Sequence, residues 1–195
     1  MAEETRQKAV RLFFAIWPDK ETCMQLDRLT GRLASVCEGR KTKAENIHLT
    51  LVFVGEVNAS QVEALCRAAD EIEGHGVRAF DLVIERICVW KRKNIVYAEI
   101  NEVPRPLMDL VEALQSSLSL VGFSLEERSY KPHITLMRNA SCKTLPERAE
   151  PMVWRAREWV LVKSDQTSDG PVYTPIGRWF LKGDQRMINS LNHQR

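Results

Sequence analysis

The sequence has no long apolar run, no low-complexity stretch and no strong excess of either charge. No run approaches the roughly 18 apolar residues that a membrane span needs, and no apolar signal core precedes the first expected strand. We therefore expect a cytoplasmic protein with no membrane contact. The formal net charge of +2 is too small to indicate a nucleic-acid-binding surface by itself, so any such contact must be local.

The cysteines show no C-x-x-C pair, and their odd number fits poorly with a disulfide framework. We therefore expect reduced thiols. Several of these cysteines fall on the apolar faces of expected helices, so cysteine catalysis is not expected. The five positions are Cys23, Cys37, Cys66, Cys88 and Cys142.

The length and composition are those of an ordinary folded domain. The chain has 195 residues, of which 44% are hydrophobic and 28% are charged. A chain of this length buries a good core as one domain or as two tightly joined lobes. We expect a single domain over residues 1–195 made of two intertwined lobes, with a polar tail at about 184–195.

Hydrophobic periodicity predicts alternating strands and helices. Apolar residues recur at three- and four-residue steps in the helices, and short runs rich in β-branched and aromatic residues predict the strands. The expected helices are Lys20 to about Cys37, closed by Gly39, then Ser60–Glu73, and a segment from Pro104 and Pro106 to Gly122. The expected strands are Arg11–Ile16, Ile47–Val54, Phe80–Trp90, Ile95–Ile100, His133–Met137, Trp154–Lys163 and Tyr173–Leu181.

The order strand, helix, His-x-Thr strand occurs twice in the chain. The first copy contains His48-Leu49-Thr50-Leu51 and the second contains His133-Ile134-Thr135-Leu136, and corresponding points lie about 83 to 85 residues apart. Such self-similarity indicates an internal duplication. Two related lobes would bring their two motifs face to face across a cleft.

The two motifs carry groups suited to acid and base chemistry on a phosphate. In a strand, alternate side chains share one face, so each His-x-Thr places an imidazole beside a hydroxyl. Histidine, with an ordinary pKa of about 6.5, serves as base or acid at neutral pH. Thr50 and Thr135 would donate hydrogen bonds to phosphate oxygens, and Arg138 would offset the charge that develops in the transition state.

Other interpretations of the histidines are less favoured. A single histidine in an apolar strand is more often a core residue, but two copies of H-[LI]-T-L at equivalent places of a duplication favour a functional pair. Neither motif has a carboxylate or cysteine at metal-ligand spacing, so we expect neither a metal nor a cofactor. His75 and His193 lack this context and are expected at the surface.

At these residues the sequence resembles the 2H phosphoesterase superfamily, and within it the bacterial RNA 2',3'-cyclic phosphodiesterases once named 2'-5' RNA ligases. The resemblance spans nearly the whole chain. It takes in RLFFAI, HLTLVFVGEV, the R-x-Y-x-P-H-I-T-L-x-R segment from Arg128 to Arg138, and the closing YTPIGRW.

The resemblance implies a fold and a reaction. The fold is α+β and bilobal, a pseudo-twofold duplication in which antiparallel sheets line a central cleft and helices pack outside. The reaction is the metal-independent opening of a 2',3'-cyclic phosphate at an RNA end, leaving a terminal 2'-phosphate. His48 would be the proton donor to the leaving 3' oxygen and His133 the proton acceptor that activates water, while Thr50 and Thr135 bind the phosphate.

Other positions are expected to hold the terminal nucleotide. Arg128, Tyr130 and Arg138 flank the second motif, and family members often carry Phe where Tyr130 stands. Aromatic surface for a base is expected from Phe13, Phe53 and Tyr97. Core packing is the alternative for each, and for Phe13 and Phe53 it carries at least equal weight. Core positions are expected for Trp154, Trp159 and Trp179.

Three functions remain open at this point. The first is hydrolysis of RNA 2',3'-cyclic phosphate ends, tRNA fragments among them, by a monomer, with 2'-5' ligation as the reverse reaction. The second is a module that binds such RNA ends without turnover. The third is the same chemistry on small cyclic nucleotides or on an ADP-ribose cyclic phosphate.

Overall fold

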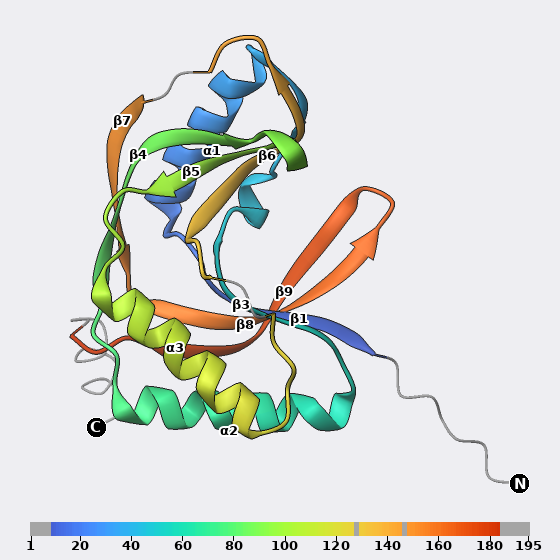
Figure 1. Cartoon of the computed structure of the whole chain (residues 1–195), viewed down its shortest axis with the longest axis vertical. Coiled ribbons are helices and arrows are strands. Elements are labelled where there is room, and N and C mark those ends of the chain that lie inside the picture. The colour runs from blue at the N-terminus through green and yellow to red at the C-terminus, as the bar shows by residue number, and fades with distance from the viewer. Residues whose placement is uncertain (1–8, 127–128, 146–147, 184–195) are drawn as a thin grey trace, which may run out of the picture.

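The computed structural model describes residues 9–126, 129–145 and 148–183 (Figure 1). The expected polar tail and Arg128 lie outside these residues. The helices are α1 (Lys20–Ala34), α2 (Ala59–His75) and α3 (Arg105–Leu120), with 3-10 turns η1 (Ala44–Asn46) and η2 (Lys91–Lys93). The strands are β1 (Val10–Ile16), β2 (Cys37–Lys41), β3 (Leu49–Val57), β4 (Phe80–Trp90), β5 (Ile95–Ile100), β6 (His133–Cys142), β7 (Arg148–Ala156), β8 (Glu158–Thr167) and β9 (Gly170–Phe180).

The helices begin where the sequence supplies capping groups. The Asp19 side chain accepts a hydrogen bond of 2.8 Å from the backbone N–H of Thr22 at the start of α1. Asn58 and Gln61 form a capping box at the start of α2, and Gly76 ends that helix in the left-handed conformation. These local signals satisfy backbone groups that the helix itself leaves unpaired.

Two expected elements are wrong in type or extent. The first helix ends at Ala34, and Cys37–Lys41 form strand β2, so Gly39 lies in a strand and does not close a helix. The expected strand Trp154–Lys163 is the end of β7 joined to the start of β8, with Arg157 between them. Strands β2 and β7 pair with β6 and β4, which lie far away in the sequence, where local periodicity carries no information.

The strands form one nine-stranded sheet in the order β7-β4-β5-β6-β3-β1-β8-β9, with β2 paired to β6 and all these strand pairs antiparallel. The order is symmetrical about its centre. On one side the second-motif strand β6 is followed by β5, β4 and β7, and on the other the first-motif strand β3 is followed by β1, β8 and β9. Among the described residues, the ladder between the two halves of the sheet consists of Leu49 paired with Ile134.

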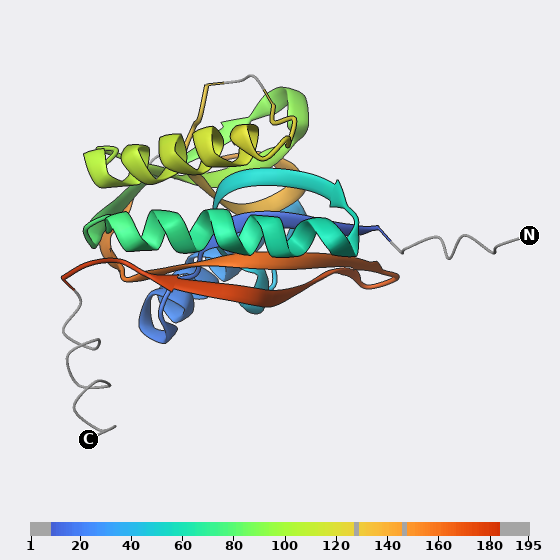
Figure 2. The same cartoon turned by 90° about the horizontal axis from the view of Figure 1, so that it is seen from below.

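The helices cover the two halves of the sheet crosswise. Helix α1 follows β1 in the chain but packs against β2, β6 and β7 in the other half. Helices α2 and α3 lie side by side, α3 against β3 and α2 against β9 (Figures 1 and 2). The fold is therefore α+β with antiparallel strands and helices packed on their outer faces, as expected.

The core is continuous across the junction of the two halves. Leu49 and Ile134, the central residues of the two motifs, have no exposed surface. Trp154, Trp159 and Trp179 are buried as expected, and the rings of Trp159 and Trp179 stack with centroids 4.8 Å apart. Among the described residues, no helix combines the length and apolar character needed to span a membrane.

A disulfide joins Cys37 in β2 to Cys142 in β6, so the expectation of five reduced thiols is wrong for these two. The two cysteines are 105 residues apart in sequence, but the register of β2 with β6 places them directly opposite one another. Spacing alone gave no sign of this pairing. Cys23, Cys66 and Cys88 are free thiols, and burial raises the pKa of each.

Candidate active site

Each motif histidine is oriented by a backbone carbonyl two residues before it. His48 Nδ1–H donates to the Asn46 oxygen at 2.7 Å, and His133 Nδ1–H donates to the Lys131 oxygen at 2.8 Å. Because a carbonyl only accepts, the proton of the neutral ring is held on Nδ1 and Nε2 is left for other contacts. His48 Nε2 lies 3.1 Å from Thr50 Oγ1, which donates to it.

The two motifs converge on one cavity. The pairing of Leu49 with Ile134 sets the motif strands β3 and β6 side by side. The cavity has a volume of about 410 Å³ and is lined by both histidines and both threonines of the motifs. The His-x-Thr pattern therefore predicted which four side chains the fold brings together.

His48 is a weak base in this structure. Burial lowers its pKa to about 4, the hydrogen bond to the Asn46 carbonyl opposes this, and the positive charges of Arg138 and His133 lower it further. At neutral pH the ring is therefore uncharged. A negative group beside Nε2 would raise this pKa because it stabilises the imidazolium.

Aromatic rings enclose both histidines. Trp17 stacks on His48 with ring centroids 5.2 Å apart, and Phe13 and Tyr173 contact the same ring at 5.0 and 5.3 Å. Around His133, the ring centroids of Trp90 and Tyr97 lie at 4.5 and 5.8 Å. Packing on several sides fixes the direction of each imidazole.

The expected nucleotide-binding residues take different places. Arg138, Phe13 and Phe53 line the cavity, Phe13 almost fully buried and Phe53 43% exposed. Tyr97 and Tyr130 are not among its lining residues. The Tyr130 hydroxyl donates to the backbone oxygen of Thr50 at 2.9 Å, which places Tyr130 in support of the first motif.

Sequence reasoning missed much of the cavity wall. One part is a hydrogen bond of 2.9 Å from Asn46 Nδ2 to the Pro171 carbonyl, which ties η1 to the start of β9. Of the missed residues, Arg11 and Tyr173 lie inside segments that the resemblance had singled out, RLFFAI and YTPIGRW. The additional lining residues are Arg11, Arg40, Lys41, Thr42, Lys43, Asn46, Ser164, Gln166, Asp169, Pro171 and Tyr173.

The cavity is strongly basic although the chain is nearly neutral. Among the described residues that line it are three arginines and two lysines against the single carboxylate of Asp169. Lys41 forms an ion pair of 3.2 Å with Asp27, outside the cavity lining. A local excess of positive charge therefore lies where the two motifs meet, which suits an anionic ligand.

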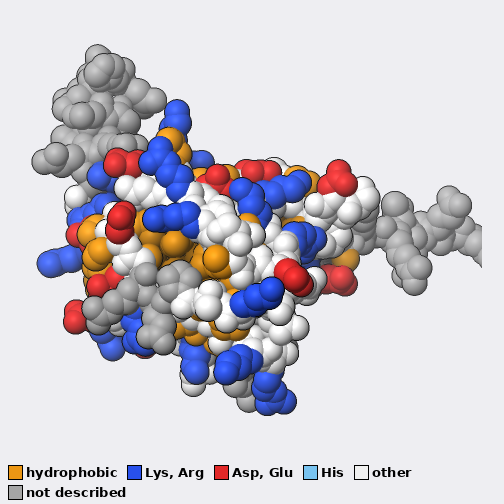
Figure 3. Space-filling model, turned by 90° about the horizontal axis from the view of Figure 1, so that it is seen from above, with side chains coloured by type: hydrophobic (Ala, Val, Ile, Leu, Met, Phe, Trp, Pro, Cys, Tyr) orange, Lys and Arg blue, Asp and Glu red, His pale blue; other side chains and the backbone are white. Residues whose placement is uncertain are grey.

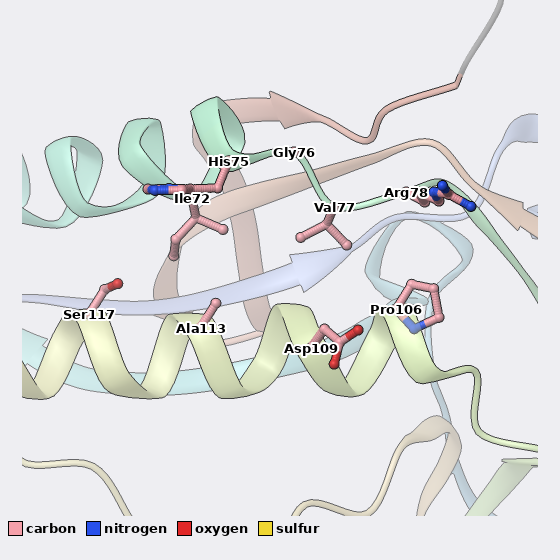
Figure 4. Close-up of a pocket in the computed structure, with 9 residues that line it drawn as sticks. All are labelled: Ile72, His75, Gly76, Val77, Arg78, Pro106, Asp109, Ala113 and Ser117. Atoms are coloured by element: carbon pink, nitrogen blue, oxygen red, sulfur yellow. The ribbon is translucent and has the colours of Figure 1, made fainter.

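Another cavity, of about 470 Å³, lies between α2 and α3 (Figure 4). Two of its titratable groups are already engaged: His75 Nδ1 donates to the Glu71 carbonyl, and Asp109 pairs with Arg105. Neither motif contributes to it. Across the part of the chain that the structure describes, no group of three or more His, Cys, Asp or Glu residues is arranged to hold a metal ion.

Comparison with known proteins agrees with this geometry. The chain is 34% identical over 172 residues to the RNA 2',3'-cyclic phosphodiesterase of Escherichia coli, covering 88% of this chain and 96% of that protein. The chain belongs to the LigT-like phosphoesterase family. The family's sequence model, LigT like Phosphoesterase, matches residues 16–97 of the chain, which include the first His-x-Thr motif.

Two further comparisons extend over nearly the whole of this LigT-like phosphoesterase. The RNA 2',3'-cyclic phosphodiesterase of Thermotoga maritima is 30% identical over 191 residues, covering 89% of this chain and 97% of that protein. The crystal structure of E. coli LigT complexed with 3'-AMP superposes with a TM-score of 0.81 at 32% identity, covering 90% of this chain and 99% of that chain. The fold expected from the resemblance is confirmed.

Proposed function

We propose that this protein hydrolyses the 2',3'-cyclic phosphate at the end of an RNA and leaves a terminal 2'-phosphate. The observation that carries the proposal is the convergence of His48, His133, Thr50 and Thr135 on one basic cavity. The named activity of the E. coli and T. maritima relatives supports it, as does the 3'-AMP bound to E. coli LigT.

The proposed chemistry needs one base and one acid. His133 Nε2 takes a proton from water, and the water oxygen attacks phosphorus. The bond between phosphorus and the 3' oxygen breaks, and His48 Nε2–H gives its proton to that oxygen, so that the product carries a 2'-phosphate and a free 3' hydroxyl. Each histidine has Nε2 available because its Nδ1 is held by a carbonyl.

The proposed role of His48 requires a bound substrate. With a pKa of about 4, His48 lacks at neutral pH the proton that an acid must donate. The negative charge of the cyclic phosphate would raise this pKa once the phosphate lies against Nε2. Thr50 and Thr135 would donate to the non-bridging oxygens, and Arg138 would neutralise the developing charge.

We further propose that residues 1–195 form a single domain of two intertwined lobes that acts as a cytoplasmic monomer, on substrates that include tRNA fragments. The crosswise packing of α1 supports the intertwining. Disulfides are uncommon in a reducing cytoplasm, so the redox state of Cys37 and Cys142 in cells tests the location. Run in reverse, the same site would join a cyclic phosphate to a 5' hydroxyl as a 2'-5' linkage.

The test is to incubate the protein, with a metal chelator, with an oligonucleotide that ends in a 2',3'-cyclic phosphate, and to identify the product. We expect a 2'-phosphate, and we expect His48→Ala and His133→Ala each to lower kcat by roughly 10²- to 10⁴-fold. His75→Ala is the matched control, because His75 is exposed and lies outside this cavity. Undiminished turnover by both motif variants would contradict the proposal.

The same assay separates the alternatives. Tight binding of the oligonucleotide with no product after long incubation, unchanged by divalent metal, would indicate a module that binds RNA ends. Turnover of cyclic mononucleotides or an ADP-ribose cyclic phosphate in strong preference to oligonucleotides would indicate a small-molecule phosphodiesterase.

A further inference from the structure

Two arginines stand directly opposite one another beside the motifs. The register of β2 with β6 pairs Arg40 with Arg138, and both side chains line the cavity. Like charges at opposed positions of an antiparallel pair repel and destabilise the sheet. Within the described residues neither arginine forms an ion pair that would offset this repulsion, so the arrangement favours an anion between or beside them.

A third arginine reaches the same place. The charges of Arg138, Arg11 and Arg40 all act on the hydroxyl of Tyr173 and oppose the rise in its pKa that burial causes. A methyl group built on Gly170 would meet Arg40 Nη1 at 3.5 Å, so the Arg40 guanidinium extends from β2 to the start of β9. The three arginines and Tyr173 therefore line one cavity, and the three charges all reach the Tyr173 hydroxyl.

The cyclic phosphate does not account for all of this charge. The proposed reaction employs the two motifs and Arg138. Arg138 follows Met137 in β6, and its charge lowers the pKa of His48. The charges of Arg11 and Arg40 have no role in this proposed reaction. Arg11 is paired in register with Glu56 across β1 and β3, but among the described residues it forms no ion pair with it. Asp169 is the one carboxylate in the cavity lining.

We propose that Arg11 and Arg40, with Tyr173, form a second phosphate subsite that binds the phosphodiester on the 5' side of the terminal nucleotide. An arginine presents its donors in a planar fork that suits two oxygens of one phosphate. The inference rests on the proposed function and narrows it, because it makes the substrate a nucleotide with phosphate on both sides of its ribose. A strand of RNA supplies this phosphate and a cyclic mononucleotide with a free 5' hydroxyl does not.

The experiment compares two small substrates that differ only in this group: one nucleoside 2',3'-cyclic phosphate with a 5' hydroxyl, and the same compound with a 5'-phosphate. We expect the wild-type protein to show a kcat/KM at least about 10-fold higher for the 5'-phosphorylated compound, because charge-assisted hydrogen bonds are among the stronger ones. The quantity measured is the ratio of the two kcat/KM values.

Variants at the subsite should lower that ratio toward one. We expect this of Arg11→Gln and of Arg40→Gln, with Arg40→Lys intermediate because it keeps the charge but loses the fork. Arg92→Gln is the control: it removes one positive charge from a residue outside the cavity lining, and it should leave the ratio at the wild-type value. Circular dichroism and thermal melting establish that each variant is folded.

The outcomes distinguish the inference from the proposed function. If the wild-type protein turns over neither compound nor the cyclic-phosphate oligonucleotide, the proposed function fails. If it turns over both compounds with a ratio near one, or if Arg11→Gln and Arg40→Gln keep the wild-type ratio, the function stands and the subsite is overturned. If Arg92→Gln lowered the ratio as much as Arg11→Gln and Arg40→Gln do, the preference for the 5'-phosphorylated compound would come from the general charge of the protein. That result would also overturn the subsite.

Discussion

His48 and His133 share a local hydrogen-bonding arrangement that the amino-acid composition does not reveal. Each donates Nδ1–H to the carbonyl two residues before it, so the proton of each neutral ring is held on Nδ1. The repeated His-x-Thr pattern predicted that the two histidines would line one cavity. Their aromatic neighbours Trp17, Tyr173 and Trp90 were not, because no local pattern relates these positions to the motifs.

At the residue scale we predict a pH dependence of stability that originates at His48. Its pKa is about 4 in the folded chain against about 6.5 when unfolded, so the unfolded state binds more protons between these values. The free energy of unfolding should therefore fall as the pH falls from about 6.5 to about 4, by up to about 3 kcal/mol from this group. Above this window the contribution does not change.

Urea unfolding at several pH values from 4 to 7 measures this effect. Acidic residues titrate in the same range, so the informative quantity is the difference between the wild-type protein and His48→Gln, which should lose less stability on acidification. His75→Gln should follow the wild-type curve. Parallel curves for the wild type and His48→Gln would show that burial does not depress the pKa of His48.

Strand β2 is the element that the sequence analysis missed, and it carries part of the cavity. Only Cys37 of its five residues is buried, so its sequence shows no apolar alternation. It forms because β6 offers an edge, and a register shift lies between Glu38 and Arg40 in the pairing. Such irregularities redirect side chains. Here the register shift lies directly before Arg40, which is paired with Arg138.

At the element scale we predict that Gly39→Ala disrupts this pairing. Gly39 has a φ of +124°, and a methyl group there would lie 2.7 Å from the Asn139 oxygen and 2.9 Å from the Ala140 Cα, which are backbone atoms of β6. We expect a loss of roughly 1 to 3 kcal/mol in the free energy of unfolding. Activity should fall as well, since Arg40 and Arg138 flank this point.

Gly31→Ala is the matched control. Gly31 lies in α1 with nothing within 4 Å of the added methyl group, so the substitution should stabilise the protein by about 0.5 to 1 kcal/mol through helix propensity. Thermal or urea unfolding of both variants measures the difference. Equal stability of Gly39→Ala and the wild type would mean that β2 is not held against β6 as described.

In the whole molecule, the two halves of the sheet meet at the two motifs, and a disulfide joins β2 to the second-motif strand β6. The bond between Cys37 and Cys142 closes a long loop, with the two residues 105 apart in sequence. In the face shown in Figure 3, an area of apolar side chains is exposed among Lys, Arg, Asp and Glu side chains.

At this scale we predict that reduction destabilises the folded protein. Closing a long loop restricts the unfolded chain, and native disulfides of this kind contribute about 2 to 4 kcal/mol. Urea unfolding with and without dithiothreitol should show a loss of this size. Cys37→Ala/Cys142→Ala should be less stable in both conditions and insensitive to reductant, whereas Cys66→Ala should remain sensitive. Superimposable curves for the wild type in both conditions would contradict the prediction.

The sequence by itself determined the periodic elements, the duplication and the four motif side chains, because these depend on residues close together in the chain or repeated within it. Only the tertiary structure decided the pairing of β2 with β6, the disulfide, the crosswise position of α1 and the arginines that line one cavity with Tyr173. Each of these depends on segments that lie far apart in sequence and meet through strand register. No local pattern encodes that register, because it is set by how the two halves pack on one another.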